Sequence, residues 1–204
     1  MEEGWETRGK AVLEETFNEC KSYLNAPNWE WEFVKELEGV HIFRMPGPNN
    51  MPVSKAECFL EKSPEQIFQY TNNPQHTERF GPKCKEFKVL EEGSDIRLQY
   101  LQFKVKWPME NREILYVEGP KQDDIAHYLV GKSLDTNIPV EKKHTRAFMH
   151  LYAIQVKSLG DGQTQIKLIV QVDPKGHAPG IFAKSLQAGI ASDLKELKKA
   201  LSKL

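Results

Sequence analysis

The chain has 204 residues, and its 28 lysine and arginine residues nearly balance its 29 aspartate and glutamate residues, for a formal net charge of -1. This balance gives no overall attraction to nucleic acid, and the length favours one domain with a large core over two domains. Because the acidic first residues lack the apolar segment of a signal peptide and no apolar run could span a bilayer, we expect a soluble cytoplasmic protein.

The N-terminal part of the sequence predicts a helix followed by three strands. Residues 3–24 carry apolar side chains at spacings of mostly three to four, which is typical of a surface helix, and Pro27 ends it. Over residues 29–45, aromatic and aliphatic residues alternate with charged ones around a Glu-Gly turn, which predicts two paired strands. A third strand is expected at 53–61.

The middle of the chain begins with helix signals and continues as strands. Ser63 and Pro64 are of the types preferred at a helix start, with Gln66 in the position of a capping box, and a second helical turn ends at Gly81-Pro82. Over residues 84–173, apolar alternation recurs in about six segments separated by Gly, Asp, Asn and Pro. Together with the first three strands, these segments predict a sheet of about nine strands.

The last predicted element is a long amphipathic helix at 181–204. Its apolar residues recur every three or four positions, its first half is rich in small residues, and its second half ends in lysines. A wide, curved antiparallel sheet cannot fill its concave face with its own side chains, so this helix or a ligand must cover that face. The expected fold class is α+β, with two short middle helices and the last helix as a lid over a cavity.

Strands expected at 96–105 and 112–118 would form one side of this cavity. Alternate residues of each strand share a face, which is apolar near the connecting loop and polar at its other end. Arg97 and Glu118 could meet there diagonally, either inside the cavity or as a solvated surface pair. The pairs expected across the two strands are Phe103 with Ile114, Leu101 with Tyr116, and Gln99 with Glu118.

Three segments resemble the START (StAR-related lipid transfer) family. Residues 108–113, Pro-Met-Glu-Asn-Arg-Glu, are similar to a family loop and the strand after it, with Glu113 in place of the usual Asp. Residues 172–182 resemble the family's strand end, turn and Pro-initiated last helix, and residues 63–68 resemble its Ser-Pro-Glu helix start. The resemblance covers nearly the whole chain and implies a helix-grip fold.

The resemblance also implies that the protein binds a lipid and exchanges it between membranes, without covalent chemistry, cofactor or metal. The pattern comes closest to family members that bind phosphatidylcholine, but their aromatic cage aligns with Leu101, Ile114 and His150, which cannot enclose a quaternary ammonium. The phosphate-binding Arg of those members aligns near Thr77, and the nearby Arg79 does not align with it. We therefore expect a phospholipid, sterol or ceramide-like ligand other than phosphatidylcholine, bound by a monomer in transient contact with a membrane surface.

The expected functional residues fall into two groups. The loop at 106–111 and the last helix are the movable parts, and Arg112 and Glu113 are expected to orient that loop. The predicted membrane contacts are Lys106, Trp107 and Met109. The predicted ligand-binding residues are Arg97, Gln99, Leu101, Phe103, Ile114, Tyr116, Glu118, Phe148, His150, Tyr152, Ile181, Leu186 and Ile190.

Two other functions stay open on the sequence alone. An enzyme acting on an apolar acyl or polyketide-like substrate in the same cavity could use His150, Glu118 or Asp173 as an acid or base. No catalytic motif occurs in the sequence, and a lone His on a strand is more often structural. The other alternative is a lipid-sensing module whose lid contacts a partner protein.

Overall fold

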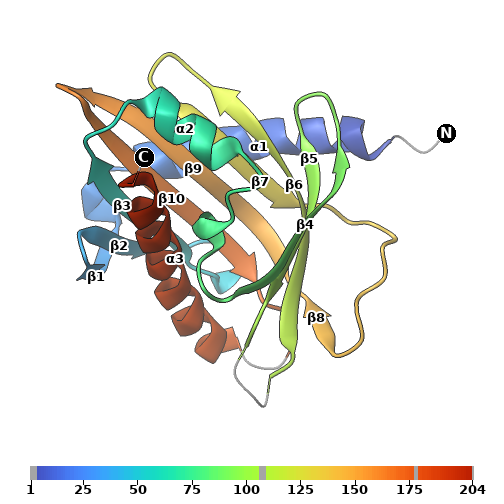
Figure 1. Cartoon of the computed structure of the whole chain (residues 1–204). Helices are drawn as coiled ribbons and strands as arrows, with labels where there is room; N and C mark the ends of the chain where they lie inside the picture. The colour runs from blue at the N-terminus through green and yellow to red at the C-terminus, as the bar shows by residue number, and fades with distance from the viewer. Residues whose placement is uncertain (1–3, 106–108, 177–178, 204) are drawn as a thin grey trace.

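The computed structural model describes residues 4–105, 109–176 and 179–203, and the side chains of residues 49, 78 and 179–188 lie outside this description. An extended curved sheet lies between two long helices (Figure 1). The elements in chain order are α1 (Trp5–Asn25), the 3-10 helix η1 (Asn28–Glu30), β1 (Glu32–Leu37), β2 (Val40–Met45), η2 (Pro48–Asn50), β3 (Val53–Leu60), α2 (Pro64–Asn72), η3 (Glu78–Phe80), β4 (Cys84–Glu92), β5 (Arg97–Phe103), β6 (Asn111–Gln122), β7 (His127–Ser133), β8 (His144–Arg146), β9 (Phe148–Gly160), β10 (Gln163–Asp173) and α3 (Pro179–Leu201).

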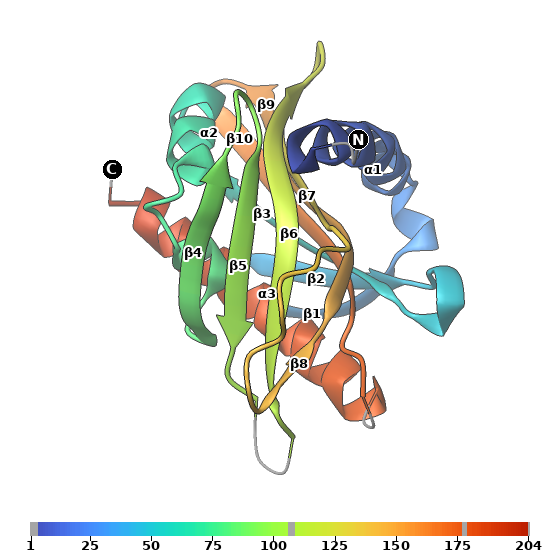
Figure 2. The same cartoon turned by 90° about the vertical axis from the view of Figure 1, so that its right-hand side faces the viewer.

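The strands form one ten-stranded sheet. Its order is β1-β2-β3-β10-β9-β7-β6-β5-β4, with antiparallel neighbours throughout, and the short β8 pairs in parallel with β6. Register shifts interrupt the pairings of β1 with β2, β4 with β5, and β9 with β10. Because such bulges bend a strand and increase its twist, the sheet curls around α3 (Figure 2). The predicted α+β class and the curved antiparallel sheet are confirmed.

Helix α1 covers the convex face of the sheet. Its buried residues Leu13, Phe17, Cys20 and Leu24 recur at the helical spacing that the sequence shows, and they join a core cluster with residues of β5, β6, β7 and β9. Gly9 allows the helix to approach closely, since a Cβ atom at this position would lie 2.8 Å from Cδ1 of Ile96. The convex face is therefore filled by the protein's own side chains.

Helix α3 covers the concave face. Its fully buried residues belong to a core cluster that also contains residues of β2, β3, β9 and β10, so the predicted lid helix is confirmed and begins two residues earlier than expected. No helix in the described ranges is long and apolar enough to cross a membrane. The buried residues of α3 are Ile190, Ala191, Leu194, Leu197 and Leu201.

The connection between β3 and β4 has the predicted helical form. Ser63 caps α2, because its hydroxyl accepts a hydrogen bond of 3.2 Å from the main-chain N–H of Gln66. The second helical turn is η3, which ends at Phe80, one residue before Gly81. This turn brings the side chain of Arg79 toward the sheet, as described below.

The pairing of β5 with β6 differs from the predicted register by two residues. Leu101 lies opposite Ile114, Gln99 opposite Tyr116, and Arg97 directly opposite Glu118 rather than diagonal to it. The expected register would place residue 105 opposite Arg112, whereas Phe103, two residues earlier on β5, lies there. Because side chains alternate with a period of two, a shift of two leaves every residue on its predicted face.

Two local differences concern the strand ends. The segment from residue 29 begins with the 3-10 turn η1, and β1 starts only at Glu32. Ala147 separates the short β8 from β9, and this division adds one strand to the segments expected over residues 84–173. Seven strands therefore follow the middle helices instead of about six.

Candidate functional site

A largely apolar cavity lies between the concave face of the sheet and α3. Its walls come from the ends of β5 and β6, from β9 and β10, from the segment around η3, and from the middle of α3. The space exists because a sheet of this width and curvature cannot be filled by one covering helix. The apolar lining residues are Phe80, Leu101, Phe103, Val105, Ile114, Ala147, Met149, Leu168, Val170, Val172 and Ile190.

One end of the cavity is formed by a buried ion pair. Arg79, from η3, donates two hydrogen bonds of 2.5 and 2.8 Å to the carboxylate of Glu118 on β6, and both side chains are almost completely buried. A third contact joins Arg79 to the hydroxyl of Tyr152 at 3.4 Å. Arg97 lies 3.5 Å from Glu118 and donates a hydrogen bond of 2.7 Å to Asn72 on α2. The network ties α2 and η3 to the floor of the sheet.

The ion pair sets the charge states at this end of the cavity. Burial is the largest single influence and lowers the pKa of Arg79, but the charge and hydrogen bond of Glu118 together with the nearby Tyr152 and Tyr116 outweigh it, so the net pKa lies above the usual arginine value. Burial, followed by the charge of Glu118, also raises the pKa of the Tyr116 hydroxyl. The pKa of Tyr152 is raised mainly by its burial. Arg79 therefore stays charged, and both hydroxyls stay neutral and able to donate a hydrogen bond.

Several buried polar atoms beside this pair have no hydrogen-bond partner among the described residues. They include both amide atoms of Gln99, the hydroxyl of Tyr116 and Nε of Arg79. Gln99 and Tyr116 face each other across β5 and β6. Since a buried polar group without a partner costs free energy, such groups normally bind water or a ligand. Unpartnered donors and acceptors thus lie directly behind the inner end of the cavity, which Arg79 and Tyr152 line.

A half-buried acid, Asp193, lines the cavity from α3. Burial raises the pKa of Asp193 to about 8, against the opposing effect of the nearby Lys83. The backbone at Gly81 passes directly beneath it, and a Cβ atom at Gly81 would lie 2.2 Å from an Asp193 carboxylate oxygen. Gly81 also has a positive φ of 60°, so only glycine fits this contact without strain.

Arg112 connects two segments at the other end of the cavity. Its guanidinium donates hydrogen bonds to the main-chain carbonyls of Glu110 at 2.5 Å, Pro174 at 2.8 Å and Lys175 at 3.2 Å. Glu110 precedes β6, whereas Pro174 and Lys175 lead from β10 toward α3. The expected loop-orienting role of Arg112 fits these bonds, which also reach the segment before the lid.

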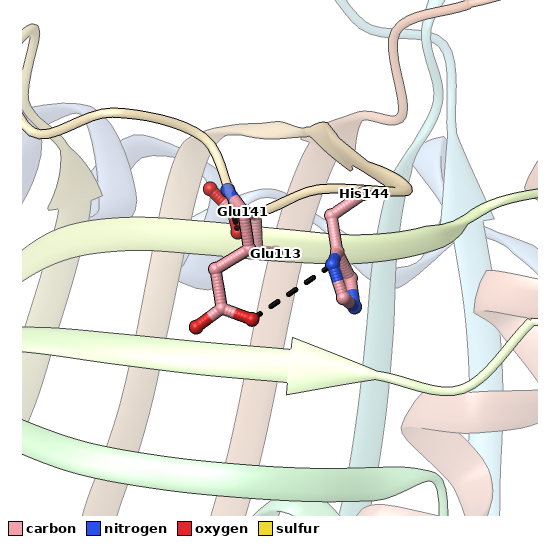
Figure 3. A group of neighbouring side chains, drawn as sticks. All are labelled: Glu113, Glu141 and His144. Carbon is pink, nitrogen blue, oxygen red and sulfur yellow. Dashed lines mark hydrogen bonds and ion pairs between the residues drawn. The ribbon is translucent and has the colours of Figure 1, made fainter.

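Glu113, Glu141 and His144 form a group whose ligand-type atoms all lie within 4.8 Å of one another (Figure 3). Such a set could in principle hold a metal ion, but the partners of Glu113 indicate another role. One carboxylate oxygen accepts a hydrogen bond of 2.7 Å from Arg146, and the other accepts bonds from Tyr100 and from the main-chain N–H of Glu141. The guanidinium already neutralises the buried carboxylate, so the group acts as a structural anchor.

The predicted ligand-binding residues divide into those that line the cavity and those behind its inner end. Leu101, Phe103, Ile114, Tyr152 and Ile190 line it. The side chains of Ile181 and Leu186 lie outside the described residues, as do Lys106 and Trp107 of the predicted membrane contacts, and Met109 is half-buried. The residues around the buried ion pair, beyond the cavity lining, are Arg97, Gln99, Tyr116 and Glu118.

The placement of Phe148 and His150 in the cavity is corrected by the structure. In the pairing of β9 with β10, Gln171 faces Leu151 and Val172 faces Met149, so His150 is the extra residue of a bulge. A bulge reverses the alternation beyond it, and Met149 therefore lines the cavity in place of His150. The rings of Phe148 and His150 instead pack against each other at 4.8 Å.

Sequence reasoning missed Arg79 and Asp193. Arg79 does not align with the phosphate-binding Arg of the family members that bind phosphatidylcholine, and no role is predicted for it from the sequence. A buried Glu118 on a cavity-facing strand nevertheless requires a cationic partner, and this requirement is the signal that could have pointed to Arg79. Asp193 interrupts the apolar side of the last helix between Ile190 and Leu194, and this interruption marks it as a lining residue. Both lie on segments whose position over the sheet depends on the tertiary fold.

Comparison with known proteins identifies the fold. The family model described as START domain matches residues 15–204. The structure is similar to that of human StAR-related lipid transfer protein 5, with a TM-score of 0.85, and to that of human STARD10, with a TM-score of 0.78. The first is 13% identical and the match covers 98% of this chain and 99% of that one; the second is 19% identical, covering 92% and 78%.

A more distant similarity involves an enzyme. The Zhui aromatase/cyclase from a Streptomyces species matches with a TM-score of 0.52 and 13% identity, over 74% of this chain and 90% of that one. Among curated proteins, no sequence matches the chain significantly. At such identities the solved structures show the shared fold and nothing finer.

Proposed function

Because the chain belongs to the START domain family, we propose that it acts as one domain that binds a lipid in its cavity and transfers it between membranes. The observation that carries the proposal is the apolar cavity beneath α3, which ends on the buried pair of Arg79 and Glu118. An apolar body and a polar end are the two parts of a lipid. The site has a counterpart for each.

The energetics of transfer need no covalent step. Each methylene removed from water is worth about 0.8 kcal/mol, so an acyl chain of roughly sixteen carbons gains on the order of 10 kcal/mol in an apolar environment. The lining residues of the cavity provide that environment in place of the bilayer. What the protein must add is a lid that opens at a membrane surface, and we propose that this lid consists of α3 and the loop predicted to move, 106–111.

The polar end favours a neutral headgroup. Arg79 and Glu118 already balance each other, whereas the Gln99 amide and the Tyr116 hydroxyl offer unmet donors and acceptors. A hydroxyl or amide group can use both without adding a buried charge. The aliphatic Leu101 and Ile114 cannot form a cation–π cage. A sterol or a ceramide-like lipid therefore fits better than phosphatidylcholine.

The alternative of an enzyme in the same cavity has less support. Of the three candidate acids or bases, His150 packs on Phe148, Glu118 is neutralised by Arg79, and Asp173 pairs with Lys175 at 2.7 Å. We propose that the protein works without turnover and without a cofactor, as a cytoplasmic monomer in transient contact with membranes. Conversion of a bound ligand to a new mass over hours would contradict this.

The test is to identify the ligand and to measure its transfer. The full chain is expressed in lipid-containing cells and examined by native mass spectrometry, and transfer of the identified lipid between vesicles is then followed. The matched pair Gly189→Ala and Gly189→Phe supplies the control, since Gly189 lines the cavity and a Cβ atom there meets no atom within 4 Å. We expect bound lipid and transfer with alanine and loss of both with phenylalanine. A wild-type chain that is always empty and inactive in transfer would overturn the proposal.

A further inference from the structure

Residues 134–143, here called the strap, connect β7 to β8 and carry an exposed apolar tip. Ile138 is 38% exposed and Val140 is 47% exposed, with the exposed Pro139 between them. Apolar residues at a loop tip lose free energy in water and gain it at an apolar surface. The tip is a candidate contact surface because its three residues are consecutive.

The strap is held in place from beneath. Arg146 donates hydrogen bonds to the main-chain carbonyls of Ile138 at 3.2 Å and Pro139 at 3.1 Å, while it is paired with the buried Glu113. Glu113 also accepts a hydrogen bond of 3.2 Å from the main-chain N–H of Glu141, at the other side of the tip. The group in Figure 3 is thus the anchor of the strap. A tip fixed in this way stays exposed instead of folding onto the sheet.

Two lysines follow the tip in the strap, and a third lies on the neighbouring hairpin. Lys142 and Lys143 follow it in the strap, and Lys104 lies at the end of β5; none of the three forms an ion pair with a described carboxylate. Two of the carboxylates nearby are paired with cations, Glu113 with Arg146 and Asp173 with Lys175. Glu110 accepts a hydrogen bond from Thr145, Glu141 lies 3.9 Å from His144, and Asp135 at the start of the strap is exposed.

The strap lies against the β5–β6 hairpin, on the face opposite to the side chains of Leu101 and Ile114 that line the cavity. Its end packs on the β5–β6 hairpin, where Gln102 contacts His144 at 2.7 Å and β8 pairs with the first residues of β6. Lys104 and Arg112 of this hairpin line the cavity. Figure 2 shows the strap along the same end of the sheet at which α3 begins. A surface that held the tip would therefore also lie near the hairpin whose Lys104 and Arg112 line the cavity.

Two of the other exposed apolar residues have acidic neighbours in the sequence. Ile125, 50% exposed in the β6–β7 turn, follows Asp123 and Asp124. Trp29, 82% exposed in η1, is followed by Glu30 and, two residues later, by Glu32. Carboxylates repel an anionic surface, so these two patches are poorly suited to contact an anionic membrane.

We propose that the strap is a membrane-docking element, in which Ile138, Pro139 and Val140 enter the interface of an anionic bilayer and Lys142, Lys143 and Lys104 meet its headgroups. Docking in this way brings the β5–β6 hairpin, which lines part of the cavity, to the bilayer surface. The inference rests on the proposed lipid transfer, because it assigns the surface through which the lipid is exchanged. Each lysine near an anionic surface contributes up to about fivefold in binding.

The experiment measures flotation of the full chain with vesicles of phosphatidylcholine alone or with about 30% phosphatidylserine. Two strap variants are used, Ile138→Ser/Val140→Ser and Lys142→Gln/Lys143→Gln. The matched control is Ile125→Ser, which removes a side chain of similar exposure at the opposite end of the sheet. Bound lipid, measured by native mass spectrometry, and the unfolding midpoint show that each variant is folded and filled.

We expect the wild type and Ile125→Ser to bind the anionic vesicles, and each strap variant to bind at least about fivefold more weakly while keeping its ligand. High salt should weaken wild-type binding, because the lysine contribution is screened. The inference would be overturned if the wild type did not bind vesicles or if the strap variants bound them as well as the wild type does. Neither result would contradict the proposal that the cavity binds a lipid. A chain that docks through the strap but never contains lipid would instead contradict the proposed function.

Discussion

Arg79 and Glu118 form two parallel hydrogen bonds, of 2.5 and 2.8 Å, with both side chains sealed from solvent. Removal of the carboxylate charge by Glu118→Gln leaves a buried cation uncompensated, at an expected cost of about 3–5 kcal/mol in the free energy of unfolding. The double variant Arg79→Met/Glu118→Leu should recover most of this loss, since apolar side chains often replace a buried pair without cost. Urea unfolding of the three proteins measures both effects. Losses below about 1 kcal/mol for the single variant would show that water reaches the pair.

Asp193 should make the stability of the protein depend on pH. Its pKa rises from 3.8 to about 8 on folding, because α3 buries it against the cavity. The folded state therefore binds more protons than the unfolded state between these values, and stability falls as pH rises toward and through 8. Asp193→Asn removes this dependence. Urea unfolding at pH 5 and pH 8 is expected to show a larger decrease for the wild type than for the variant; equal decreases would contradict the assignment.

Lys55 should produce the opposite slope at higher pH. This almost fully buried lysine lies over the rings of Trp31 and Phe43, at 4.3 and 4.6 Å, and burial lowers its pKa to about 8. The unfolded state then binds more protons between pH 8 and 10.5, so stability rises with pH through this window. NMR titration of the Lys55 ammonium should give a midpoint near 8. A midpoint near 10.5 would mean that the two rings fully compensate for burial.

Gly189→Ala should stabilise the protein while leaving the cavity usable. Glycine inside a helix costs roughly 0.5–1 kcal/mol relative to alanine, and a Cβ atom at this position meets nothing within 4 Å. An increase of that size in the free energy of unfolding, measured without ligand, is expected. A decrease would indicate that α3 requires the flexibility of glycine here.

The regular parts of this fold were predictable because they repeat. Strand β4 spans Cys84–Glu92, the segment that alternation indicates, and α2 begins after the Ser63 cap as its residue types require. The cavity-facing sides of β5 and β6 were also assigned correctly, because the two-residue error in register preserves the faces. Such features depend on local periodicity, which one sequence displays.

The features that escaped prediction depend on single positions or on distant contacts. Nothing local marks His150 as the extra residue of a bulge, yet it decides whether His150 or Met149 faces the cavity. Arg79 reaches Glu118 only because η3 folds back over β6, across 39 positions of sequence. Alternation cannot encode either arrangement.

The three carbonyl bonds of Arg112 have a kinetic consequence for anything held inside. Two of the bonds, to Pro174 and Lys175, fasten the β5–β6 hairpin to the segment that leads into α3, so these two segments cannot part without breaking both. At about 1.5–3 kcal/mol for each hydrogen bond to a charged group, the fastening is a latch with closed and released states rather than a graded hinge. We expect the residence time of a bound molecule to depend on how often this latch opens as well as on the length of its apolar chain.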